Sequence, residues 1–169
     1  MLLGCAHTRI APRQIPPEVL RLVELAQKRV SIKVDCPIDE IVGHQYLLIF
    51  LPFGRISVAE IEDHLKHALV TELSQLGIAP FYVKHDKDAD FVVRCDSLSL
   101  TAYDLIFFRH IVSNISLRLV SNRFSDNELP FTLNESQYRA FAFHPQLERV
   151  LQKLFTTAAQ RIGREISAL

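Results

Sequence analysis

The sequence predicts an α+β fold: a two-layer sandwich in which two long amphipathic helices lie on one face of a mostly antiparallel sheet. Apolar residues recur at helical spacing over residues 58–76 and again over 147–166, so each segment has one apolar stripe. Residues 105–120 alternate apolar and polar side chains, the period of a strand with one buried face. Two such helices can bury their stripes against one sheet face, and 169 residues suffice for one core.

The N-terminal part of the chain predicts a tether followed by a short helix. Residues 5–17 (CAHTRIAPRQIPP) contain three prolines and two arginines and show no hydrophobic period. We therefore divide the chain into a start and flexible tether over residues 1–17 and a single domain over residues 18–169. The helix is expected over residues 18–29, where four apolar residues recur at helical spacing: Val19, Leu22, Val23 and Ala26.

Two strands are expected next. Residues 30–36 (VSIKVDC) alternate apolar and polar side chains, which indicates a half-buried strand that ends before Pro37. Residues 46–53 (YLLIFLPF) are continuously apolar, so we expect a central strand that is buried on both faces.

The first long helix is expected to begin with a capping box and to end at a glycine. Ser57 and Glu60 have the capping-box spacing, in which the serine oxygen accepts from a backbone N–H and the glutamate reaches back to the cap. Gly77 can adopt the left-handed conformation that ends a helix. The expected apolar stripe consists of Val58, Ile61, Leu65, Leu69, Leu73 and Leu76.

The remaining chain predicts further antiparallel strands and a closing helix. Strands are expected over residues 78–83, 91–100 and 105–120, with a charged turn over 84–90. Turn residues over 122–131 indicate a hairpin, and 137–143 (QYRAFAF) alternates without showing which face is buried. The final helix begins at Pro145, and its stripe consists of Leu147, Val150, Leu151, Leu154, Phe155, Ala158, Ile162 and Ile166.

Composition and motifs argue against several classes of function. The chain has 19 basic and 19 acidic residues, so no basic excess indicates a nucleic-acid partner. With five glycines the chain contains neither GxGxxG nor GxxxxGK[ST], the common phosphate-binding motifs. No apolar run approaches the roughly 20 residues of a membrane-spanning helix. We expect no cofactor.

The most suggestive metal-ligand candidates are His64 and His67, which lie three residues apart in EIEDHLKH. The buried stripe of that helix leaves Glu60, Asp63 and His67 on a polar face, so we interpret the cluster as solvated surface and expect no metal. No histidine stands beside a serine or cysteine with a third orienting group. We expect no catalytic residues and no enzyme activity.

The three cysteines do not have the close paired spacing of a zinc or redox site. An odd number in an exported protein indicates that one cysteine has a separate role, and Cys5 is the candidate. Cys36 and Cys95 are then either a disulfide or two buried thiols.

Residues Leu2, Leu3, Gly4 and Cys5 resemble the lipobox of bacterial lipoproteins, in which a cysteine after a small residue is lipidated and becomes the mature N-terminus. The resemblance implies export under a signal peptide and lipidation at Cys5. Ala6 in place of aspartate implies sorting to the outer membrane. The alternative is an ordinary N-terminus that begins MLLGC by coincidence.

The segment from Ser57 to Leu169 resembles small periplasmic lipoproteins of the YajG-like kind and, more loosely, the LPS-assembly lipoprotein LptE and the auxiliary lipoproteins of envelope ABC transporters. The resemblance rests on the helix ending in LSQLGI, on ADFVVRCDSLSL, on the long alternating strand and on the final helix. It implies a non-enzymatic accessory on the periplasmic face of the outer membrane, with a barrel or a transporter as protein partner.

Three classes of function therefore stay open. The first is an envelope lipoprotein that serves assembly or transport, including an LptE-like partner of an outer-membrane barrel. The second is a soluble cytoplasmic protein-binding module in which Cys5 has no role. The third is an enzyme with a metal at His64 and His67. An upstream in-frame start that adds a basic, apolar segment before Met1 would favour the first class over the second.

Overall fold

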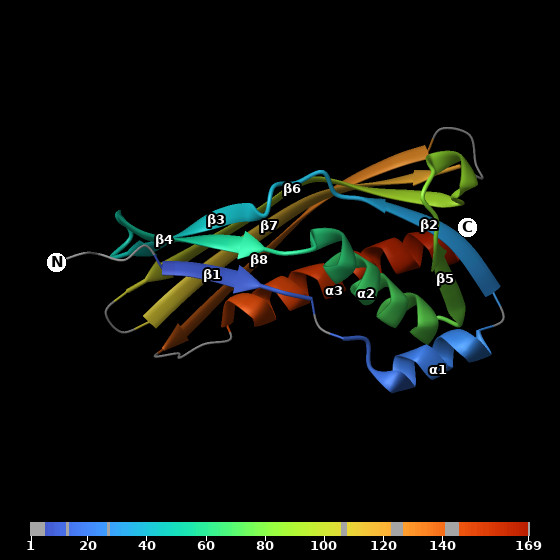
Figure 1. Ribbon diagram of the computed structural model, residues 1–169, viewed down its shortest axis with the longest axis horizontal. Helices are drawn as coiled ribbons and strands as arrows, with labels where there is room; N and C mark the ends of the chain where they lie inside the picture. Colours follow the sequence, from blue (N-terminus) through green and yellow to red (C-terminus); the bar gives the residue numbers. More distant parts are fainter. Residues whose placement is uncertain are drawn as a thin grey trace.

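The computed structural model describes residues 6–12, 14–26, 28–105, 108–122, 127–140 and 146–168. These residues form three α-helices and eight strands (Figure 1). The helices are α1 (Pro17–Leu25), α2 (Ile61–Gln75) and α3 (Gln146–Ala168). The strands are β1 (Ala6–Ile10), β2 (Lys28–Asp35), β3 (Ile41–Leu47), β4 (Leu51–Val58), β5 (Ile78–Tyr82), β6 (Phe91–Asp104), β7 (Phe108–Ser121) and β8 (Asn127–Ala140).

Strand β6 is the spine of the single sheet. Along one edge it pairs antiparallel with β7 over its whole length, and β7 pairs antiparallel with β8. Along its other edge β6 pairs with two strands, both of them parallel to it. β2 pairs with the first residues of β6, and β3 pairs with its last residues. β5 then extends the sheet beyond β2, while β4 and β1 extend it beyond β3. The long antiparallel ladders and the helices confirm the predicted α+β sandwich.

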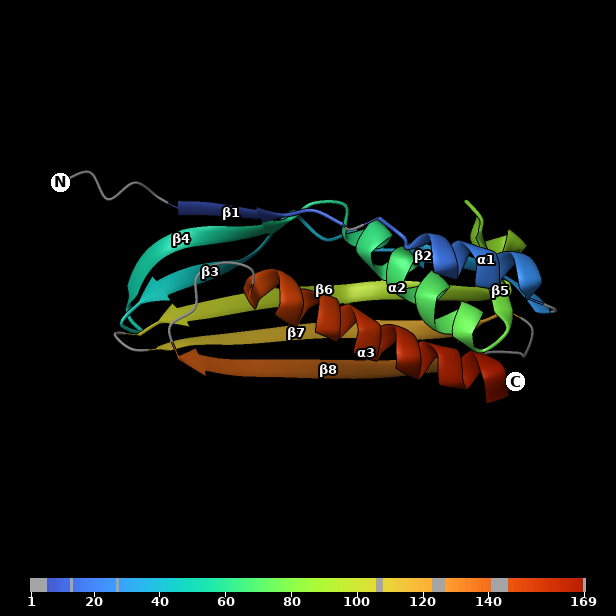
Figure 2. The same ribbon diagram turned by 90° about the horizontal axis from the view of Figure 1, so that it is seen from below.

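The helices cover one face of this sheet (Figure 2). α2 and α3 pack against each other, and α1 packs against α2 and β5. The predicted stripe of α3 is confirmed, because all eight of its residues are buried. The alternation along β7 is also confirmed, since Ile111, Ile115, Leu117 and Leu119 are buried and contribute to the core.

The prediction for residues 46–53 was wrong. The segment is a hairpin: β3 ends at Leu47, a turn occupies residues 48–50, and Leu51 of β4 pairs back with Leu47. Its side chains are not buried, since Ile49 is 62% exposed and Phe50 is 72% exposed. Leu48 and Ile49 both have positive φ, at 52° and 76°. Because this left-handed turn contains no Gly, Asn or Asp, the sequence did not show it as a turn.

The predicted capping box was also wrong. Ser57 lies within β4, and α2 begins at Ile61. Glu60 is the N-cap residue, in a left-handed conformation, and no side chain caps the helix. The end of the helix is as predicted, because Gly77 has a φ of 72°. Along the predicted stripe, Leu76 is half exposed and Val58 belongs to β4.

The segment that we expected to be a flexible tether contains a strand. β1 pairs parallel with β4, with Ala6 opposite Gly54 and Ile10 opposite Val58. Ile10 is buried, and the amide of Gln45 donates a 2.8 Å hydrogen bond to the Thr8 hydroxyl. The expected helix over 18–29 is shorter, at Pro17–Leu25. Parts of the expected hairpin turn over 122–131 and of the strand over 137–143 lie outside the described residues.

Candidate functional site

Cys36 and Cys95 form a disulfide, and their Cα atoms are 4.6 Å apart. The register of the sheet explains why they meet. Val34 lies opposite Val93 and Asp35 lies opposite Arg94, so one further step along both strands places Cys36 opposite Cys95. Adjacent strands are about 4.7–4.9 Å apart, a Cα separation that a disulfide can span. The bond therefore closes the end of the β2–β6 pairing.

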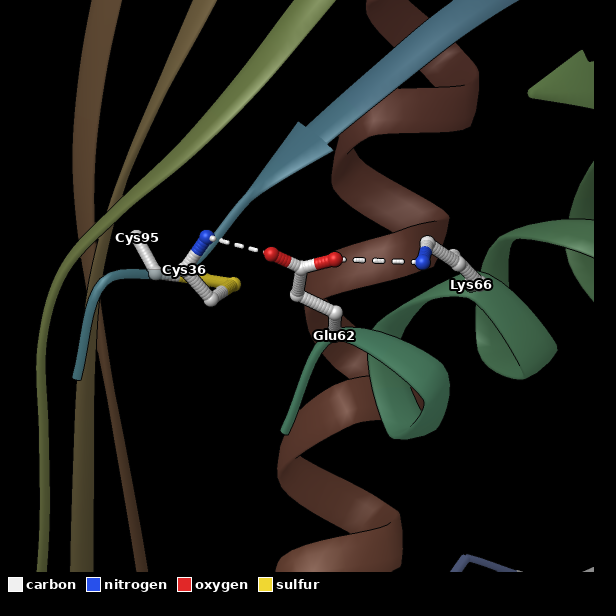
Figure 3. The surroundings of a disulfide bond; sticks show 4 residues. All are labelled: Cys36, Glu62, Lys66 and Cys95. Carbon is white, nitrogen blue, oxygen red and sulfur yellow. Dashed lines mark hydrogen bonds and ion pairs between the residues drawn. A yellow bond between two sulfur atoms is a disulfide. The ribbon is translucent and has the colours of Figure 1, made fainter. Parts of the chain in front are cut away.

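Both cysteines are buried, and the chain around them is tied to α2. The backbone N–H of Cys36 donates to a carboxylate oxygen of Glu62 at 3.4 Å (Figure 3). The other oxygen of Glu62 accepts a hydrogen bond from Lys66 at 3.1 Å. Burial acts to lower the pKa of Lys66, but its hydrogen bonds to Glu62 and Asp63 outweigh burial and raise it. The disulfide is thus held between the sheet and the first turns of α2.

The charged turn over residues 84–90 is held by ion pairs to the sheet. Its short 3-10 helix places Asp86 between Lys33 and Arg94, and the Arg94 guanidinium lies 3.0 Å from the carboxylate. Hydrogen bonds to Lys33 and Arg94 lower the pKa of Asp86. Asp86 therefore fixes the connection between β5 and β6 against β2.

His64 and His67 lie on α2, as the sequence predicts, but His64 is used in packing. Its ring stacks on Phe155 of α3 with the ring centroids 5.5 Å apart, and it donates a hydrogen bond to the Ile10 carbonyl. Burial lowers the pKa of His64, and the neighbouring His67 lowers it further. Within the described part of the chain, no three His, Cys, Asp or Glu side chains converge as a metal site would require.

A cavity of about 280 Å³ adjoins His64 between the chain before α1 and helices α2 and α3. Its lining is mainly apolar, with polar groups from both histidines and from Glu148 and Gln152. Ligand pockets usually measure about 300–1,000 Å³, so this cavity lies just below their range. The Nε2 atom of His64 is buried and has no hydrogen-bond partner among the described residues.

Cys5, the candidate lipidation residue, lies outside the described residues, but the strand that follows it is placed. β1 starts at the same end of the molecule as the β3–β4 turn and the end of β6, and it pairs with β4 (Figure 2). Among the helices that the structure describes, none combines the length and the apolar character needed to cross a membrane.

Sequence reasoning did not find the partner of Glu62 or the apolar turn at residues 48–50. A signal for the disulfide is present, however. β2 ends in Val-Asp and is followed directly by Cys36, and β6 contains Val-Arg-Cys, so the cysteines stand at equivalent positions of two matching segments. Parallel pairing of these strands is the additional fact that only the structure supplies.

The fold is shared with proteins of known structure. A protein described only as uncharacterised matches with a TM-score of 0.54 over 94% of this chain and 99% of that chain, at 13% sequence identity. At this identity the match shows a common α+β fold and nothing more. No family model matches the chain, and no curated protein does.

Two bacterial lipoproteins give lower scores. The minor lipoprotein of Acinetobacter baumannii is 17% identical, with a TM-score of 0.48 over 82% of this chain and 90% of that chain. The rare lipoprotein B of Shewanella oneidensis is 10% identical, with a TM-score of 0.49 over 82% of this chain and 94% of that chain.

Proposed function

We propose that this chain is the periplasmic domain of a bacterial outer-membrane lipoprotein, anchored through Cys5, that serves as a non-catalytic accessory in assembly or transport at the cell envelope. Its partner would be another envelope protein, such as an outer-membrane barrel or a transporter. The single observation that carries the proposal is the division of the three cysteines between a buried disulfide and the lipobox-like sequence.

The disulfide supports a location in an oxidising compartment such as the periplasm. Disulfides persist in the periplasm and other oxidising environments and are rare in the cytosol, where thiols are kept reduced. Cys36 and Cys95 are bonded to each other, which leaves Cys5 as the only cysteine available for another role. Cys5 is also the residue that follows Leu2, Leu3 and Gly4 in the pattern of a lipidation site.

The fold suits attachment at this end of the chain. β1 begins one residue after Cys5 and is paired to β4 from Ala6 onward. Little chain therefore separates the proposed anchor from the sheet. Several acyl chains on one cysteine would hold such a domain stably at a membrane without a membrane-spanning helix.

His64 has a packing role, which supports a non-catalytic function. The ring of His64 is stacked on Phe155 and hydrogen-bonded to the backbone of Ile10. A metal ligand would instead direct a ring nitrogen toward an ion shared with other side chains.

The test is the intact mass of the protein expressed from its native locus with its upstream sequence, as wild type and as Cys5→Ser. We expect a mature chain that begins at Cys5 and has the added mass of a diacylglyceryl group and an acyl chain, and we expect the variant to lack both. An unmodified chain that retains Met1 in the wild type would contradict the proposal. It would favour the cytoplasmic protein-binding module instead.

A further inference from the structure

The β3–β4 hairpin has an exposed apolar tip, formed by Leu47, Ile49, Phe50, Leu51 and Phe53. Burying large apolar side chains is worth about 1.5–3 kcal/mol each, so leaving them in water needs an explanation. The hairpin is also poor in charge, because Arg55 is the only Asp, Glu, Lys or Arg residue between positions 41 and 58. An exposed apolar surface of this composition is typical of a site that binds a membrane or another protein.

The backbone of the tip is strained at two positions. Leu48 and Ile49 occupy the left-handed region, which costs an L-residue roughly 1–2 kcal/mol and is least suited to a β-branched side chain. Asn or Gly would make the same turn with less strain. Strain of this kind is characteristic of functional positions, where the side chain matters more than the stability of the turn.

The tip lies near the start of β1, the strand that directly follows the proposed lipid anchor in the sequence. Ala6, the residue after Cys5, pairs with Gly54, and Gly54 is three residues from the start of β4. At the rise of a strand this corresponds to about 10 Å along the sheet. Segments that bind in the membrane interface bury their apolar face about 5–10 Å deep. A lipidated Cys5 at the membrane surface would therefore bring the tip within reach of the acyl chains.

A row of aromatic rings stands directly behind the tip. Tyr46 stacks on Tyr103 with ring centroids 5.6 Å apart, and Tyr103 stacks on His110 at 5.9 Å. Tyrosine has an apolar ring and a polar hydroxyl and is enriched where a membrane meets water. In the register of β6 and β7, the pair after Tyr103 and His110 is Asp104 and Arg109. These two side chains form an ion pair, so their opposite charges neutralise each other.

We infer that the β3–β4 tip is a membrane-docking element that inserts into the lipid interface beside the anchor and orients the sheet relative to the membrane. The inference rests on the proposed anchorage at Cys5. A second group of exposed apolar residues, including Leu25, Leu76 and Phe81, lies at the other end of the molecule, and its distance from β1 leaves it outside this role.

The chain has no tryptophan, so a single introduced tryptophan reports its own surroundings. The test uses the full chain with Phe50→Trp, and the matched control is Phe81→Trp, an exposed phenylalanine at the far end. Because Cys36 and Cys95 are bonded to each other, Cys5 is the one remaining cysteine of the three. Its thiol adds across the double bond of a maleimide-headgroup lipid in phosphatidylethanolamine–phosphatidylglycerol vesicles, and a thioether forms.

On such vesicles, emission from the Phe50→Trp protein should shift to shorter wavelength and be quenched by lipids with brominated acyl chains. Emission from the Phe81→Trp protein should do neither. Adding Ile49→Asp to the Phe50→Trp protein should abolish both effects, since it places a charge in the tip, while aspartate tolerates the left-handed backbone.

Three results would overturn the inference: no quenching of the Phe50→Trp protein, equal quenching of the Phe81→Trp protein, or quenching unchanged by Ile49→Asp. The last would mean that the tether alone brings the tip near lipid. The first would show that the tip does not enter the lipid interface. Since the maleimide attaches Cys5 chemically, the outcome is independent of acylation in the cell, which the intact mass tests separately.

Discussion

Removing the Cys36–Cys95 disulfide should lower the free energy of unfolding by about 4 kcal/mol. The bond joins residues separated by 59 positions. Closing a loop of that length removes about 14 cal/mol/K of entropy from the unfolded chain, or about 4 kcal/mol at 25 °C. For a chain of this size, each kcal/mol corresponds to roughly 2–4 °C in Tm, so the melting temperature should fall by roughly 8–16 °C.

The assay is urea unfolding of the oxidised wild type against Cys36→Ala, Cys95→Ala and the double variant. Each single substitution breaks the same cross-link, so each should lose nearly as much stability as the double variant. Non-additivity of this kind is expected for residues that act as a unit. The control is Cys5→Ala, which removes a thiol and leaves the cross-link in place.

Two results would refute this reasoning. A thiol titration that finds three free cysteines in the unfolded, unreduced protein from an oxidising compartment would show that the bond does not form. A loss below about 1 kcal/mol in the double variant would show that the cross-link hardly restricts the unfolded chain.

Three further predictions concern single positions. Gly43→Ala should cost at least about 3 kcal/mol in urea unfolding, because a Cβ there would lie 1.6 Å from the carbonyl oxygen of Leu100; a near-neutral variant would contradict the close approach of β3 to β6. Gly163→Ala should add about 0.5–1 kcal/mol to the free energy of unfolding, since the new Cβ approaches only two leucine methyl groups, at 3.3 and 3.7 Å, and a loss would show that they cannot yield. Because burial lowers the pKa of His64, the unfolded state binds the proton more readily, so the free energy of unfolding should decline as pH falls below about 6.5. His64→Phe should flatten that decline, and a variant with the same pH profile as the wild type would contradict this assignment.

The elements that could be predicted from the sequence are those whose period is long and whose burial follows from it. β7 and α3 extend over many residues, and their apolar positions repeat often enough to fix both the type of structure and the buried face. The end of α2 was also predictable, because Gly77 is the residue type that a left-handed helix end requires.

Other elements depend on interactions that no local pattern shows. The run from Tyr46 to Phe53 has the composition of a buried strand, but left-handed Leu48 and Ile49 reverse the chain in the middle of it. β1 is a five-residue edge strand in a segment rich in proline, and it is defined by pairing with β4 far along the chain. Composition alone is therefore a poor guide where tertiary pairing decides the structure.

The candidate site shows the same division. Cys5, Cys36 and Cys95 could be singled out from their number and spacing, but the parallel register of β2 and β6 was needed to explain why two of them meet. His64 could be named as a titratable residue, but its stacking on Phe155 comes from the packing of α2 against α3. The sequence thus identified the reactive and titratable residues, but it did not show which residues they contact.

The parallel pairing of β1 with β4 has a mechanical consequence. If Cys5 is held at a membrane and a partner pulls on the domain, tension enters the sheet at Ala6 and acts along the axis of β1. Such a force acts in shear on all the hydrogen bonds that join β1, from Ala6 to Ile10, to β4, so they resist together and do not open one at a time. The buried side chain of Ile10 adds resistance at the far end of the strand. A short edge strand can thus serve as a strong attachment point.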